Sequence, residues 1–342
     1  MSTLGNDWLR FETVLRGEVP DRVPLTHTWG LHAPHVRQLL GRPPQTPEDE
    51  IHYRVCAGLP LGLRVGRGSP FGGGHALTAD GQERYVQGHL KPGCSLRPYQ
   101  DPGDLSPLLP EWRRRIHASH VAGLAAEACV TSCIHALSIA LGLEALAFAA
   151  YDQPDWLNEA MDLVERRNRA TIAALLDLGV DIVLFDGDCA FKQGLMLSPD
   201  MMRRFWLQRT RDTVRLCHDA QTWAYYHTDG RVDQLMPMLV DLGFAAFHGC
   251  EKAANNLAQL KRTWGRRITL IGNADQAELT RLSPERIAKE TLDMIRTAAP
   301  GGRFVADLNT SVAEFIPLEN YLAFTDTVRR AGRYAPDGSL VT

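Results

Sequence analysis

The amino-acid sequence predicts an α/β fold of the (β/α)8 TIM-barrel class, and three observations lead to this prediction. Apolar strands and amphipathic helices alternate strictly from residue 180 to residue 332, with short connections. The strands are apolar on both faces, which is typical of a parallel sheet covered by helices. No GxGxxG or Walker A motif follows a strand, so the usual signs of an open nucleotide-binding sheet are missing. Five consecutive units and one earlier strand favour the closed barrel over the open sheet.

The predicted elements follow one another in a regular order. An early strand is expected in RVPLTHTW, and further strands are expected at residues 180–188, 222–229, 244–251, 266–275 and 302–311. A helix is expected after each of these five, at residues 197–220, 231–243, 256–265, 282–299 and 316–332. Ser198 and Ser283 each precede a proline, which is the pattern of an N-cap followed by the first helical position. Gly243 and Gly265 are the expected helix ends.

The stretch from about residue 40 to residue 150 is expected to form an insertion on the barrel. It contains GRGSPFGGGH, which predicts a glycine-rich loop, and LTADGQERYVQGHL, which predicts a β-hairpin with Asp80 and Gly81 at its turn. No serine-, glycine- or proline-rich linker divides the chain. Residues 1–342 are therefore expected to form a single domain.

Composition and charge exclude several classes of function. The formal net charge is −3, so no polyanion-binding face and no polybasic membrane patch is expected, and nucleic acid and membranes are not predicted partners. No apolar run approaches the roughly 20 residues of a membrane helix. The seven cysteines are scattered, without a CxxC pair, and the N-terminus lacks the apolar stretch of a signal peptide. Reduced thiols and a cytoplasmic location are expected.

Polar side chains stand at nearly every predicted strand end, where a barrel of this kind carries its active site. Polar groups placed beside a barrel core are costly unless they serve a purpose. Helix capping explains some of the acids, Asp275 among them, but not the histidines. The strand-end set comprises His27, Trp29, Asp186, Asp188, His227, Asp229, His248, Cys250, Glu251, Asn273, Asp275, Asp307 and Asn309.

Two kinds of chemistry suit this set, and residue spacing does not decide between them. A catalytic zinc needs three protein ligands and an open position. His227 and Asp229 would supply two ligands, with Cys250, Glu251 or Asp307 as the third. Alternatively, histidine and aspartate act as general acid and base without a metal.

Four segments, in their order along the chain, resemble the uroporphyrinogen decarboxylase superfamily, which includes true decarboxylases and cobalamin-linked methyltransferases. They are LRGEVPDRVPL, GVDIVLFDGDCAFKQGLMLSPDMMRRF, the H-x-x-G of residues 227–230, and VAEFIPLENY. The resemblance spans about residues 8–330 and implies a (β/α)8 barrel with its pocket at the C-terminal rim. It also suggests a homodimer.

The resemblance is closer to the methyltransferase branch than to the true decarboxylases. True decarboxylases follow the first strand with an arginine-rich segment that binds the carboxylates of the substrate, whereas this chain has no arginine there until Arg37. The methyltransferase branch carries H-x-C on the fifth strand and a later zinc-binding cysteine. Here His227 matches the histidine, Asp229 replaces the cysteine, and no cysteine follows Cys250. A set of histidine and aspartate is harder than one with two thiolates and suits activation of an oxygen atom better than of a thiol.

The resemblance implies an enzyme that moves a methyl group from a small O- or N-methyl compound, aromatic compounds included, to a corrinoid. The corrinoid is expected on a partner protein, because the chain lacks the D-x-H-x-x-G signature. Zinc is the second expected cofactor. One alternative is a metal-independent decarboxylase or lyase acting on a small carboxylic acid, and another is a non-catalytic binding protein. The expected catalytic residues are His227, Asp186 and Asp188; the expected substrate-binding residues are His27, Trp29, His248, Asn273 and Asp307; the expected metal ligands are His227, Asp229 and Cys250.

Overall fold

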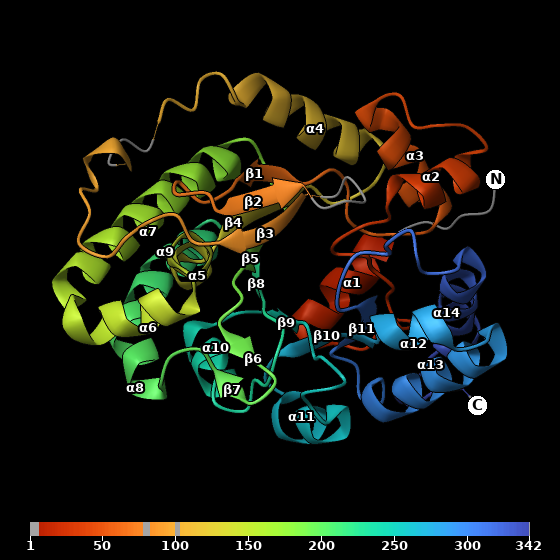
Figure 1. The fold of residues 1–342 in the computed structure, drawn as a ribbon. Helices are drawn as coiled ribbons and strands as arrows, with labels where there is room; N and C mark the ends of the chain where they lie inside the picture. The colour runs from red at the N-terminus through yellow and green to blue at the C-terminus, as the bar shows by residue number, and fades with distance from the viewer. Residues whose placement is uncertain (1–6, 78–82, 100–102, 342) are drawn as a thin grey trace.

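The computed structural model describes residues 7–77, 83–99 and 103–341, and its centre is a parallel sheet (Figure 1). Seven strands are hydrogen-bonded in the order β1-β4-β5-β8-β9-β10-β11. Their bounds are β1 Val65–Arg67, β4 Glu127–Thr131, β5 Ile182–Asp186, β8 Trp223–His227, β9 Ala246–His248, β10 Thr269–Ala274 and β11 Phe304–Leu308. The predicted α/β barrel class is confirmed, and all five strands predicted after residue 180 are present.

The predicted first strand contributes one parallel bridge instead of a full strand. Leu25 pairs with Ala306 of β11, so this segment takes the eighth position beside the last strand. The amide of Thr26 donates to the carbonyl of Ala306, and the amide of Ala306 donates to the carbonyl of Pro24. Pro24 has no N–H of its own to extend the ladder, which explains why the pairing is short.

Helices surround the sheet, as the alternation predicts (Figure 1). Their bounds are α1 Asp7–Arg16, α2 Ala33–Leu40, α3 Pro47–Cys56, α4 Leu109–Val121, α5 Cys133–Leu141, α6 Leu143–Asp152, α7 Pro154–Asp177, α8 Pro199–Met201, α9 Gln208–Asp219, α10 Met236–Leu242, α11 Leu257–Trp264, α12 Gln276–Arg281, α13 Pro284–Ala298 and α14 Leu318–Ala331. A π-helical segment, Met202–Leu207, joins α8 to α9, so the helix predicted at 197–220 is present with one wider turn. The Ser198 and Ser283 caps are confirmed, because their side chains accept from the amides of Met201 and Arg286.

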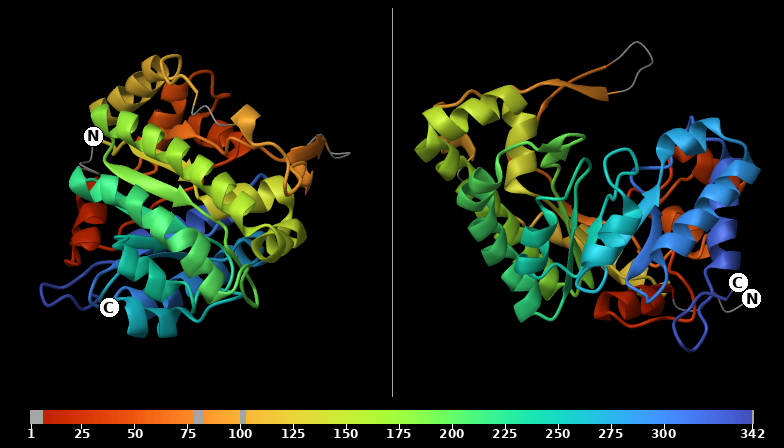
Figure 2. Two further views of the ribbon diagram at one scale, coloured as in Figure 1. Left: turned by 90° about the vertical axis from the view of Figure 1, so that its left-hand side faces the viewer. Right: turned by 90° about the horizontal axis from the view of Figure 1, so that it is seen from below.

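The insertion is smaller than predicted, because part of residues 40–150 belongs to the barrel itself. Both β1 and β4 lie in this stretch and pair in parallel, which corrects the expected boundaries. The antiparallel hairpin of β2, Gly74–Leu77, and β3, Glu83–Gln87, is present and projects from the body (Figure 2). Its predicted turn at Asp80 and Gly81 lies outside the described residues. The start of the predicted glycine-rich loop is strand β1.

Helix α1 closes the N-terminal end of the barrel interior. Phe11, Val14 and Leu15 are buried and pack in one cluster with inward-facing strand residues such as Ile182 and Tyr225. The hydroxyl of Thr269 donates to the carbonyl of Val14, which ties the helix to β10. The apolar side chains of the interior are therefore gathered at this end, and the opposite rim is left to polar ones.

Within the described ranges, no single helix is long and apolar enough to cross a membrane. Helices α5 and α6 taken together are long and apolar enough, but the two helices are bent by 110° relative to each other. All seven cysteines are free thiols.

Removing the Phe11 ring is expected to destabilise the whole barrel. Phe11 is 0% exposed, so Phe11→Ala should lower the free energy of unfolding by about 3–5 kcal/mol through lost burial and a residual cavity. Leu9→Ala is the matched control on the same helix; Leu9 is 51% exposed, and its change should stay within about 0.5 kcal/mol. Urea denaturation followed by circular dichroism measures both, and equal effects would contradict the role given to α1.

Candidate functional site

The register of the parallel strands brings three of the predicted residues to one level of the rim. Asp186 at the end of β5 pairs with His227 at the end of β8, and His227 pairs with His248 at the end of β9. Asn273 of β10 pairs in turn with Asp307 of β11. Side chains at paired positions of neighbouring strands point the same way, so Asp186, His227 and His248 gather at one rim.

The centre of the rim is a pair of histidines. The Nδ1 atoms of His227 and His248 lie 2.7 Å apart, so a single proton is shared in a hydrogen bond between them. The Nε2 atom of His248 lies 3.0 Å from the carbonyl of Leu308, which can only accept, so this nitrogen carries a proton. In the uncharged pair His248 Nδ1 is then the acceptor and His227 Nδ1 the donor. The geometry therefore leaves His227 Nε2 with a free lone pair.

The charge state of His227 agrees with this tautomer. Burial holds the pKa of His227 well below its ordinary value, and the electrostatic influence of the neighbouring His248, His135 and Arg64 lowers it further. The side chain is 5% exposed. A neutral imidazole with a bare Nε2 is the form that binds a metal or accepts a proton.

Two aspartates face this nitrogen. Ligand atoms of Asp188, His227 and Asp229 all lie within 4.8 Å of one another. The Asp188 side chain is 34% exposed and lies 3.8 Å from His227 Nε2. Its Oδ1 also accepts from the backbone amide of Asp229 at 3.0 Å. The three groups come from two neighbouring strand ends, so the rim presents two oxygens and one nitrogen to a common point.

Asp229 is the member of this group whose side chain is least satisfied by the protein. Its Oδ1 is buried and has no hydrogen-bond partner among the described residues. Burial raises its pKa to about 7, and the neighbouring charges of Asp188 and Glu251 add to the rise. Burial likewise raises the pKa of Asp186, again with Asp188 contributing and His135 opposing. An orphaned buried oxygen beside a bare imidazole nitrogen fits a bound cation, whose charge would compensate the buried carboxylate.

Asp307 organises the histidines from inside the barrel wall. It is 1% exposed, and its Oδ2 accepts from the amide and hydroxyl of Thr28 at 3.1 and 2.8 Å. Its oxygens also lie 3.2 Å from His248 Nε2 and 3.5 Å from His27 Nδ1. Burial alone would raise the pKa of Asp307, but the contacts with His248 and His27 overcome it and hold the pKa well below its usual value. Asp307 is therefore ionised.

His27 lies behind this wall. It is 2% exposed, and its Nε2 accepts from the hydroxyl of Tyr321 on α14 at 2.8 Å. Trp29, in contrast, reaches the rim, where its ring meets the His227 ring edge-on with 4.9 Å between centroids. Of the two residues predicted on the first strand, only Trp29 contacts His227.

The sequence reasoning missed a second polar layer deeper in the barrel. Arg64, on the segment leading into β1, is bonded through Nε to Glu127 of β4 at 2.7 Å. The hydroxyl of Tyr225 donates to the other oxygen of Glu127. Tyr225 stands two residues before His227 on one strand, so alternation could have placed it on the same inward face. Glu127 is a lone acid within an apolar run, and this pattern could have predicted a buried polar residue there.

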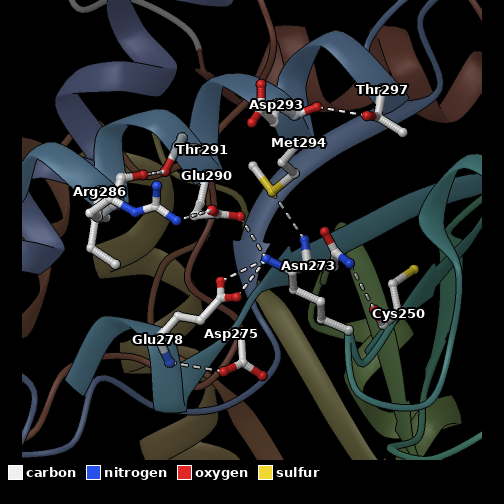
Figure 3. A network of polar contacts seen from close by, with 12 residues as sticks. Cys250, Asn273, Asp275, Glu278, Arg286, Glu290, Thr291, Asp293, Met294 and Thr297 are labelled. Carbon is white, nitrogen blue, oxygen red and sulfur yellow. Dashed lines mark hydrogen bonds and ion pairs between the residues drawn. The ribbon is translucent and has the colours of Figure 1, made fainter. Parts of the chain in front are cut away.

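Cys250 and Asn273 are placed away from the His227 group. The Cys250 thiol is 1% exposed, burial raises its pKa to about 12, and it is not among the clustered ligand atoms. The Asn273 side chain donates to the carbonyl of Cys250 at 3.2 Å, and the backbone amide of Asn273 donates to the Met294 sulfur (Figure 3). Asn273 lines a cavity of about 300 Å³ between the end of β10 and helices α11 and α13, together with Glu278 and Glu290. None of the three clustered ligands lines this cavity.

The fold and this rim define a (β/α)8-barrel protein with a titratable C-terminal rim. The chain matches the family "Uroporphyrinogen decarboxylase (URO-D)" over residues 124–331, more than half of its length, and it belongs to this family. The uroporphyrinogen decarboxylase of Coxiella burnetii (strain Dugway 5J108-111) is 26% identical over 188 residues. These residues cover 52% of this chain and 48% of that protein, so the chain spans about half the length of the curated relatives it matches.

Two solved structures share the fold over most of both chains. A methyltransferase from Methanosarcina mazei has a TM-score of 0.73 at 19% identity and covers 94% of this chain and 97% of its own. A B12-independent methionine synthase from Shewanella sp. W3-18-1 has a TM-score of 0.57 at 11% identity and covers 90% of this chain and 98% of its own. At these identities the likeness concerns the fold.

Replacing Asp229 by asparagine is expected to stabilise the protein at alkaline pH. The folded pKa of about 7 lies above the unfolded value of about 3.9, so Asp229 favours folding below pH 4 and loses that contribution as pH rises to 7. Asp229→Asn removes the buried charge and should raise the free energy of unfolding on the order of 1–4 kcal/mol at pH 8, and much less at pH 5.

Urea denaturation at the two pH values, with a chelator present, measures this difference. Asp233→Asn is the control in the same loop, because Asp233 is 43% exposed and pairs with Arg231. It should change little at either pH. A loss of stability at pH 8 in Asp229→Asn would contradict the assigned charge state.

Proposed function

We propose that the protein is a methyltransferase that takes a methyl group from a small O- or N-methyl compound, aromatic compounds included. The methyl would pass to a corrinoid carried by a partner protein. The observation that carries the proposal is the bare Nε2 of His227 grouped with Asp188 and Asp229 beside the Trp29 ring. Membership of the uroporphyrinogen decarboxylase family, and a fold shared with a methyltransferase, support it.

His227, Asp188 and Asp229 would hold a zinc ion, with Asp188 in the place first expected for Cys250. Zinc would supply a Lewis acid that polarises the heteroatom carrying the methyl group. His248 would keep His227 in the tautomer with a bare Nε2, because it accepts the Nδ1 proton. Asp307 in turn would hold His248 in place.

Without a metal, the same residues would perform acid–base chemistry. Asp229, with a pKa of about 7, would be partly protonated at neutral pH and could donate a proton to the leaving heteroatom. Asp186, whose pKa is also raised, would return the proton through Asp188. A protonated oxygen or nitrogen leaves more readily than its anion, so the methyl group would be released at a lower barrier.

A second candidate is a decarboxylase or lyase acting on a small carboxylic acid. The curated relatives that match this chain are uroporphyrinogen decarboxylases, which favours this reading. It would use His227 and the rim aspartates for proton transfer and would need no corrinoid. For either reaction we propose a small-molecule substrate and a homodimer. We also propose a cytoplasmic location, where seven free thiols stay reduced.

The metal content of protein purified without an affinity tag is the first test. Elemental mass spectrometry should find about one zinc per chain in the wild type. His227→Ala and Asp188→Ala should lose it, because each removes one of three ligands. Cys250→Ala and His52→Ala are the controls and should retain it, since Cys250 lies outside the ligand group and His52 is exposed. Zinc lost only in Cys250→Ala would overturn the ligand assignment.

The reaction type is tested with a panel of methyl ethers and methylamines and a cob(I)alamin acceptor. Methylcobalamin formation that falls by at least about 100-fold in His227→Ala would support methyl transfer. Carbon dioxide released from a carboxylic acid, without any cobalamin dependence, would support the lyase instead and exclude the first proposal.

A further inference from the structure

Among the described residues, Arg64 lies inside the barrel and retains an unused hydrogen-bonding group. The Nε of Arg64 donates to Glu127 Oε2 at 2.7 Å, and its Nη2 donates to the backbone carbonyl of Thr28. Its Nη1 has no hydrogen-bond partner among the residues that the structure describes. The side chain is 24% exposed, so it is accessible although it stands within the barrel. An ionised guanidinium with a free N–H edge is a built site for an anion.

The surroundings fix this guanidinium in one orientation. Glu127 is held from its other side by the hydroxyl of Tyr225, so the ion pair cannot easily rearrange. The Arg64 guanidinium also lies over the Trp29 ring, with Cζ at 4.7 Å from the ring centroid. Glu127, the carbonyl of Thr28 and the Trp29 ring thus hold it before any ligand arrives. A preorganised donor binds with little loss of side-chain entropy.

Trp29 connects Arg64 to the His227 group. One side of the Trp29 ring carries the guanidinium, and the ring meets His227 at 4.9 Å between centroids. Arg64 and His227 therefore contact the same aromatic side chain. A flat ligand along Trp29 would meet Arg64 at one end and His227 at the other.

The charges along this path are unequal, which gives a ligand a direction. Asp188 and Asp229 stand on the His227 side, where their ligand atoms are grouped with that of His227. Arg64 stands at the other end with an unused N–H donor. A guanidinium only donates and a carboxylate only accepts, so the carboxylate end of the ligand faces Arg64.

We propose that Arg64 determines specificity by binding the carboxylate of a small aromatic acid, through Nη1, while the ring of that acid lies along Trp29. This inference rests on the proposed function and deepens it: the methyl donor would be an aromatic carboxylate with its methylated heteroatom toward His227. Arg64 contributes recognition and orientation and takes no part in the bond that breaks.

Isothermal titration of 4-methoxybenzoate against 4-methoxybenzamide tests the inference without any turnover. The two probes have the same shape and differ in charge. The wild type should bind the carboxylate at least about tenfold more tightly, which is the worth of one hydrogen bond to a charged group. In Arg64→Gln this preference should fall to within about twofold.

Arg67→Gln is the matched control, because Arg67 lies in β1, three residues after Arg64, and its Nε donates to Thr171 of α7, on the outside of the barrel. It should keep the preference for the carboxylate. Should Arg64→Gln fail to fold because it leaves Glu127 as an uncompensated charge, the double variant Arg64→Met with Glu127→Gln removes both charges. It should likewise lose the preference.

Equal affinity for the two probes in the wild type, or no binding of the carboxylate, would overturn the inference. A preference that persists in Arg64→Gln or in the double variant would do the same. The proposed function fails separately: if no methyl group is transferred from any donor but the carboxylate preference depends on Arg64, the recognition site stands and the reaction assignment falls.

Discussion

The hydrogen bond between His227 Nδ1 and His248 Nδ1 is the interaction on which the rest of the rim depends. It determines which nitrogen of His227 is bare, and that nitrogen gives Asp188 and Asp229 a common point to face. The bond exists because β8 and β9 pair in a register that sets the two histidines side by side. Asp307 and the carbonyl of Leu308 complete it by fixing the Nε2 proton of His248.

The two ends of the barrel differ in polarity, and this difference limits how far the polar rim destabilises the fold. Phe11 and its neighbours on α1 fill the N-terminal end of the interior with apolar side chains. Above them lies the layer of Tyr225, Glu127 and Arg64, in which each charge has a partner. The rim above that layer holds Asp229, whose buried oxygen has no partner. Paired charges thus stand between the core and the unpartnered oxygen of Asp229, so the cost of burying this oxygen remains local.

Much of the fold followed from periodicity, whereas the site followed only in part. The strands after residue 180 were predictable, because apolar runs ending in histidine or aspartate alternate with capped helices. Strand β1 was missed, because three residues, Val65–Arg67, carry too little pattern to separate from a glycine-rich loop. His227 and Asp229 were predictable from their positions at a strand end. The tautomer of His227 was not, because it depends on a contact with His248, 21 positions away. The sequence predicted Asp188 as a catalytic residue and not as a metal ligand. Its place beside Asp229 depends on a hydrogen bond from the backbone amide of Asp229, which residue spacing does not predict.

The donor set bears on which reactions the rim can serve. Asp229 stands where the resemblance to the methyltransferase branch implies a cysteine. Two carboxylates and one imidazole form a harder set than thiolates do and leave more positive charge on a bound zinc ion. Such an ion polarises oxygen more strongly and binds a thiol acceptor less well. The pKa values of Asp229 and of the nearby Asp186 are raised, because burial and the neighbouring negative charges oppose ionisation. Under the proposed function, the arrangement would therefore serve as a cation site when ionised and as a proton donor when protonated, and the cation concentration and pH would decide between the two states.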